Sequence, residues 1–179
     1  SVGQFDSEVI YANSKIIGEQ LCRIYKKKYN IPVYIVRPAH TYGPGQDFKD
    51  PRIMPQLIKR AIRDKNIYIF DKGKSVRTWG YIADVCLMML NIVLSGKSMI
   101  YNVSGSDHKS ILEITKIISK IFNNKKIQFK NKNLSFTNSK YTTLKISSKK
   151  YHLEFKNKFK TKFIDGINKM IKWNNSWQK

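Results

Sequence analysis

The chain has 179 residues and a formal net charge of +22, from 34 lysine and arginine residues against 12 aspartate and glutamate residues. This length suits one domain or part of a larger protein, and its longest apolar run, residues 85–94, is too short to cross a bilayer. The charge is mostly lysine, without the interleaved aromatic and arginine residues that stack on bases. We therefore expect a solvated lysine surface, no membrane association and no specific nucleic-acid binding.

The first part of the chain predicts a helix, a strand and a loop. The helix ends near Tyr29 and carries Ile17, Leu21 and Ile24 on one face. Residues 33–36 form a continuous apolar run, which is typical of a buried parallel strand. Residues 37–45 contain two prolines and two glycines, so a loop is predicted at the carboxyl end of that strand.

The rest of the chain alternates between predicted helices and short strands, which indicates the α/β class. Ser110 and Glu113 form a capping box, Thr161 is expected to cap the last helix, and residues 131–148 are polar and irregular. The helix at 83–95 is apolar on nearly all sides and is expected to be buried. Helices are predicted at 52–64, 83–95, 110–122 and from 163 onward, and extended segments at 67–70, 77–82, 99–103 and 126–130.

The two cysteines, Cys22 and Cys86, lie in apolar helical contexts and lack the spacing of metal ligands. We interpret them as small core residues in a reducing, cytoplasmic protein. No metal site is predicted.

Residues 11–15 read Tyr-Ala-Asn-Ser-Lys, and positions four apart lie on one face of a helix. Tyr11 and Lys15 can therefore act on the same ligand. A free phenol stays protonated near neutral pH, but a neighbouring ammonium group stabilises the phenolate and makes tyrosine useful in acid/base chemistry.

Several segments, in this order, resemble the NAD-dependent epimerase/dehydratase family of the extended short-chain dehydrogenase/reductase superfamily, whose members modify sugar nucleotides. The resemblance begins at Tyr11 and Lys15 and continues through the loop that contains His40 and the segment that contains Arg77. It covers most of the chain. The matching segments are 11–19, 37–44, 75–84, 101–105, 110–113, 146–149 and 166–173.

The resemblance implies roles for particular residues. Tyr11 would be the general acid/base and Lys15 its partner and ribose ligand, and these two residues with Pro38 would contact the cofactor NAD. Arg77 would bind the diphosphate of the substrate, a nucleoside-diphosphate sugar, because its planar fork suits paired phosphate oxygens. His40 stands where many relatives carry asparagine, and neutral histidine also offers a donor and an acceptor. The remaining implied substrate contacts are Arg52, Ile53 and Phe70.

The resemblance also implies a fold, namely the C-terminal portion of a Rossmann-type doubly wound parallel sheet plus a small α/β substrate-binding domain. Residues 1–45 would end the Rossmann-type domain with the Tyr-x-x-x-Lys helix and the following strand. Residues 46–179 would mainly bind the sugar nucleotide, with some segments returning to the sheet. The family's N-terminal glycine-rich βαβ half has no counterpart here, so we expect a C-terminal fragment that is inactive alone and has an incomplete NAD site.

The implied function is a sugar-nucleotide 4-epimerase, 4,6-dehydratase or decarboxylase that acts through a transient 4-keto sugar in polysaccharide biosynthesis. A homodimer is expected for the full-length enzyme. Two alternatives stay open: a truncated remnant without turnover and, less favoured, a basic nucleic-acid-binding module.

Overall fold

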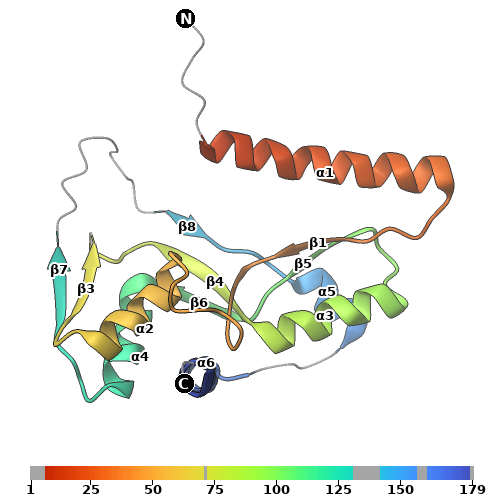
Figure 1. Cartoon of the computed structure of the whole chain (residues 1–179). Helices are drawn as coiled ribbons and strands as arrows, with labels where there is room; N and C mark the ends of the chain where they lie inside the picture. Colours follow the sequence, from red (N-terminus) through yellow and green to blue (C-terminus); the bar gives the residue numbers. More distant parts are fainter. Residues whose placement is uncertain (1–6, 71, 131–141, 157–160, 178–179) are drawn as a thin grey trace, which may run out of the picture.

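The structure, a computed structural model, describes residues 7–70, 72–130, 142–156 and 161–177 (Figure 1). The described elements form a mixed α/β protein whose strands pair into separate small sheets. The predicted α/β class is therefore confirmed.

The first sheet follows the N-terminal helix in the chain. After α1 (Ser7–Tyr29), β1 (Ile35–Pro38) pairs in parallel with β5 (Ile100–Val103). Two further helices, α3 (Ile82–Ser95) and α5 (Lys149–Phe155), pack against β5. Figure 1 shows α1 and α3 on opposite sides of the β1–β5 pair, with α1 lying apart from the other helices.

The second sheet is built around β4 (Val76–Tyr81). On it, β2 (His40–Tyr42) and β8 (Thr143–Leu144) pair in parallel with β4, whereas β6 (Asp107–Ser110) pairs in the antiparallel direction. This sheet connects the segments before and after α3, and so holds the middle of the chain together.

The third sheet is the parallel pair of β3 (Ile67–Phe70) and β7 (Ile127–Lys130). Two helices, α2 (Ile53–Arg63) and α4 (Ile111–Ile121), pack on it. The last helix, α6 (Phe163–Trp177), lies beside β2. As Figure 1 shows, these elements gather at the end of the molecule away from the loop that follows α1.

Two clusters of buried side chains form the core. The larger cluster joins α2, α4 and α6 to the second and third sheets, and the smaller one joins α3 and α5 to the first sheet. Apolar side chains of α4 and α6 point into the larger cluster, since Ile114, Ile118, Ile167 and Met170 are all fully buried.

Four elements were not predicted: β2, β6, α5 and β8, the last of which lies within residues 131–148, the stretch expected to be irregular. Within residues 37–45, expected to be a loop, His40 to Tyr42 form β2; within residues 104–109, also expected to be a loop, β6 begins at Asp107. Both expectations were wrong because these short strands are defined by their partner β4 and not by a local apolar pattern. The helix α5, with seven residues, was missed for the same reason: only Tyr151 is buried.

The expectation that the helix at 83–95 is buried on nearly all sides was also wrong. Val85, Met88 and Ile92 are buried against the first sheet, but Leu94 on another face is 72% exposed. Cys86, expected in the core, is exposed as well. One helix can bury only the face that has a neighbour, and in the described part of the chain α3 packs through one face.

The helix starts show one success and one correction. Ser110 Oγ accepts the Glu113 N–H at 3.2 Å and Glu113 Oε2 accepts the Ser110 N–H at 2.7 Å, so the capping box is confirmed. Thr161 instead donates its N–H and its hydroxyl to Asp84, at 2.9 and 3.0 Å. These bonds tie the start of α3 to Thr161, two residues before α6. Of the stretch predicted to be irregular, residues 131–141 lie outside the described residues.

Candidate active site

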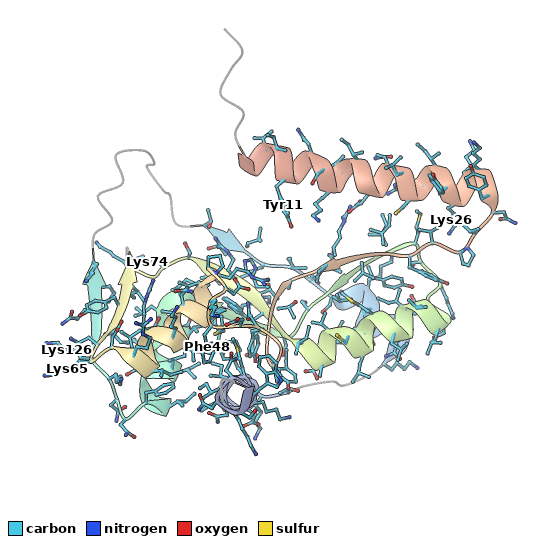
Figure 2. The ribbon with its side chains drawn as sticks, in the orientation of Figure 1. Tyr11, Lys26, Phe48, Lys65, Lys74 and Lys126 are labelled. Atoms are coloured by element: carbon cyan, nitrogen blue, oxygen red, sulfur yellow. The ribbon has the colours of Figure 1, made fainter. Side chains whose placement is uncertain are left out.

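Tyr11 and Lys15 lie on α1 and both are exposed, Tyr11 to 65%. The Lys15 Nζ atom is 5.1 Å from the centroid of the Tyr11 ring, a distance at which an ammonium group and an aromatic ring attract each other. Figure 2 shows Tyr11 on the side of α1 that faces the sheets. The structure thus brings the predicted pair together on a surface that a ligand can reach.

An ion pair holds α1 on β1. Arg37 donates from Nε and Nη2 to the two carboxylate oxygens of Glu19, at 2.6 and 2.5 Å. These hydrogen bonds lower the pKa of Glu19 below its ordinary value. Because Glu19 is one turn beyond Lys15, the pair orients the Tyr11–Lys15 face toward the carboxyl end of β1, where Pro38 is exposed. Sequence reasoning missed this contact, since nothing local relates two residues 18 positions apart.

His40 lies beside Trp79 on the second sheet. The two residues are register partners in β2 and β4, and their ring centroids are 5.4 Å apart. His40 is exposed overall, but the loss of water on its covered side and, to a smaller extent, the positive charge of Arg77 lower the pKa of its imidazole. His40 is therefore neutral near pH 7, with one donor and one acceptor nitrogen.

Arg77 is half-buried and holds β8 in place. Its guanidinium donates to the Thr142 carbonyl and hydroxyl oxygens, both at 2.6 Å, and to the Val76 carbonyl at 2.9 Å. A guanidinium has five N–H donors, of which these bonds use three. The residue predicted to bind a diphosphate thus also has a structural role that the sequence did not indicate.

Arg52 borders a cleft of about 730 Å³ formed by residues 41–47 with Lys49, Asp50 and Ile82. Its Nε and Nη2 donate to Asp50 Oδ2 at 2.8 and 2.5 Å, and these bonds lower the pKa of Asp50 to about 2. Ile53, predicted to contact the same ligand as Arg52, is half-buried and packs against the larger core cluster.

The predicted site residues therefore fall into three groups: Tyr11 with Lys15, His40 with Arg77, and Arg52 at the cleft. Phe70 ends β3, and its side chain lies outside the described residues. No helix in the described part of the chain is long and apolar enough to cross a membrane. Nor do the described residues gather three acidic, histidine or cysteine side chains where a metal ion would bind.

Comparison with known proteins supports the resemblance. The family described as "NAD dependent epimerase/dehydratase" matches residues 1–104. A dTDP-4-dehydro-6-deoxy-D-allose reductase from Streptomyces sp is 32% identical over 110 residues, which are 60% of this chain and 34% of the reductase.

Solved structures share the fold. A dTDP-glucose 4,6-dehydratase from Bacillus anthracis in complex with NAD superposes with a TM-score of 0.79 at 22% identity, covering 99% of this chain and 57% of that one. A UDP-glucuronic acid 4-epimerase from Bacillus cereus in complex with UDP-glucuronic acid and NAD has a TM-score of 0.75 at 25% identity, covering 93% and 52%. The chain thus spans about a third of the curated reductase and just over half of these structures.

Proposed function

Because the chain belongs to the NAD-dependent epimerase/dehydratase family, we propose that it is the catalytic and substrate-binding part of an enzyme that modifies a nucleoside-diphosphate sugar. The reaction would be a 4-epimerisation, a 4,6-dehydration or a decarboxylation in polysaccharide biosynthesis in the cytoplasm. The observation that carries this proposal is the exposed Tyr11–Lys15 pair, with 5.1 Å between the ammonium nitrogen and the ring centroid.

The side chains of α1 would contact one end of the cofactor. Lys15 is exposed and can donate to ribose hydroxyls, and Pro38 is exposed at the carboxyl end of a parallel strand, the usual ligand edge of such sheets. Bound NAD supplies the hydride acceptor and donor for this chemistry. With Lys15 stabilising its phenolate, Tyr11 would take the proton of a sugar hydroxyl, become the neutral phenol, and later return that proton to the sugar.

The substrate would lie near the other two groups. The cleft beside Arg52, about 730 Å³, is within the range of small-molecule sites. We propose that Arg52, the backbone at Ile53 and Phe70 contact the sugar nucleotide, that Arg77 binds its diphosphate, and that neutral His40 hydrogen-bonds the sugar.

The division of the chain is also part of the proposal. Residues 1–45 would end a Rossmann-type domain, and residues 46–179 would mainly bind the substrate, with β5 returning to pair with β1. On α1, Ile17, Leu21 and Ile24 are each at least half exposed. Such an apolar face favours a covering partner, and we propose that a homodimer of the full-length enzyme includes it.

A fused enzyme tests the function. The NAD-binding portion of the Bacillus anthracis dehydratase would be joined ahead of α1, and the fused enzyme incubated with dTDP-glucose and, separately, UDP-glucuronic acid. We expect NMR of the sugar to show an epimerised, dehydrated or decarboxylated product. A fused enzyme that retains NAD and binds both sugar nucleotides, yet leaves them unchanged, would contradict the proposal.

A further inference from the structure

A second pocket, of about 280 Å³, lies after the end of β5, between β6 and α5. The described residues that line it include none of those proposed above for catalysis or substrate binding. Its location differs as well. Thr78 and His108 are register partners, and alternation along β4 directs Thr78 to the face opposite Arg77 and Trp79. The pocket therefore lies on the other side of the second sheet from His40.

The ionisable residues that line this pocket are all basic. They are His108 on β6, Lys145 before α5, and Lys149 and His152 on α5, all exposed. The sequence places these side chains up to 44 positions apart, so only the fold collects them. A pocket whose described charged groups have one sign attracts ligands of the opposite sign.

Nearby carboxylates do not neutralise this charge, because each has another partner. Asp107 pairs with Lys109, with 3.2 Å between Nζ and Oδ1. Glu154 accepts the Tyr101 hydroxyl at 2.8 Å and the Lys97 N–H at 2.7 Å. Neither carboxylate lines the pocket.

The pocket also has polar groups held in defined positions. Ser104 and Ser148 are buried, and their hydroxyl oxygens are 3.1 Å apart. Ser104 Oγ donates to Ser148 Oγ, and Ser148 Oγ donates to the Ser104 carbonyl oxygen at 3.4 Å. Buried hydroxyls that satisfy each other in this way are rigid, so the serines form a fixed polar wall.

A hydrogen-bond chain orients the His108 ring. The Ile146 N–H donates to Thr78 Oγ1 at 2.8 Å, and Thr78 Oγ1 lies 2.9 Å from His108 Nδ1. The threonine oxygen accepts the Ile146 N–H, and its own hydroxyl can donate to Nδ1. When Nδ1 accepts this bond, the ring proton is on Nε2, which makes Nε2 a donor for a ligand.

We propose that this pocket binds a phosphate oxyanion, either as inorganic phosphate or as the phosphoryl group of a small sugar phosphate. Two lysines provide the charge, the His108 Nε2–H provides a directed donor, and oxyanions accept such charge-assisted bonds well. The volume exceeds that of a phosphate ion alone, so part of a sugar also fits. This anion site is separate from the sugar-nucleotide site and does not depend on the function proposed for it.

The test uses the 179-residue chain and backbone amide NMR at constant ionic strength. Inorganic phosphate, glucose 1-phosphate and UDP are titrated separately. With phosphate or glucose 1-phosphate we expect saturable shifts at residues 104–108 and 145–149. The double variant Lys145→Gln/Lys149→Gln should weaken binding about threefold or more, since each exposed charge contributes modestly. Its control, Lys116→Gln/Lys120→Gln, removes two exposed lysines of α4 and should leave the affinity unchanged.

Each outcome decides the proposal. Tighter binding of glucose 1-phosphate than of phosphate identifies the sugar phosphate as the ligand, and equal binding identifies free phosphate. His108→Gln, which keeps the lysines, should also weaken binding. Shifts that spread over the lysine surface without saturating, or equal losses in the two double variants, would overturn the site. Tighter binding of UDP at these residues would assign the pocket to the sugar nucleotide and also overturn it.

Discussion

Arg37 and Glu19 join α1 to β1 through two parallel hydrogen bonds, at 2.6 and 2.5 Å. Arginine and carboxylate match in this geometry, so the pair specifies an orientation and not only an attraction. Glu19 lies one turn after Lys15 and Arg37 directly precedes Pro38, so one contact relates the Tyr11–Lys15 pair to the end of β1. The exposed position limits its contribution to stability but not its role in alignment.

Tyr11→Phe tests the catalytic assignment in the fused enzyme. It removes the hydroxyl proposed to move the sugar's proton but keeps the ring, so turnover should fall by about two to four orders of magnitude with substrate affinity nearly intact. Tyr25→Phe changes another exposed tyrosine of α1 and serves as the control. Steady-state kinetics with a saturating sugar nucleotide measure the difference. Near-normal turnover in Tyr11→Phe would refute the assignment.

Arg77→Ala separates the proposed diphosphate contact from the observed anchoring of β8. Loss of charge-assisted bonds should weaken sugar-nucleotide binding by about 1.5 to 3 kcal/mol. Thr142→Val removes a hydroxyl partner of Arg77 and leaves the guanidinium in place. Calorimetric titration of the fused enzyme should therefore give a much larger loss for Arg77→Ala. If the two variants lose the same affinity, Arg77 acts only by holding β8.

Two helical glycines should respond to alanine in opposite ways. At Gly166 in α6 an added Cβ would be 2.8 Å from the hydroxyl oxygen of buried Tyr42 and 2.9 Å from Tyr81 Cδ2, whereas at Gly18 in α1 nothing lies within 4 Å. Gly166→Ala should therefore destabilise the chain by about 1 to 3 kcal/mol through overpacking. Gly18→Ala should stabilise it by up to about 1 kcal/mol through helix propensity. Urea unfolding of the 179-residue chain measures both changes. If the two substitutions change the free energy of unfolding in the same direction, the close packing around Gly166 is contradicted.

The ion pair of Asp50 and Arg52 beside the cleft should make the free energy of unfolding depend on pH. Hydrogen bonds from Arg52 lower its folded-state pKa from 3.8 to about 2. Between pH 2 and pH 3.8 the unfolded chain therefore binds more protons than the folded chain. The contribution of Asp50 to the free energy of unfolding is complete above pH 3.8 and is lost as the pH falls toward 2. Asp50→Asn should flatten this part of the pH profile of the unfolding free energy. Adding Arg52→Gln to Asp50→Asn should change the pH profile little further. If the effects of the two substitutions add instead, the two residues do not act through their ion pair.

Local sequence predicted those elements whose side chains repeat at a regular spacing. The helices beginning at Ile111 and Phe163 were expected because their apolar residues recur at helical intervals, and the Ser110 capping box depends on residues three positions apart. The short strand β2 and the helix α5 have no such pattern. They form because β4 and β5 offer them partners.

The sequence by itself determined that Tyr11 and Lys15 share one face of a helix, because helical geometry relates residues four apart wherever the helix lies. It also identified the family through segments whose order is a property of the chain. Only the tertiary structure decided that Arg37 holds Glu19, that Trp79 covers His40 and that His108 meets Lys149 around one pocket. Those contacts join residues 18 or more positions apart, and such distances in sequence are closed by packing and strand pairing, which no local pattern encodes.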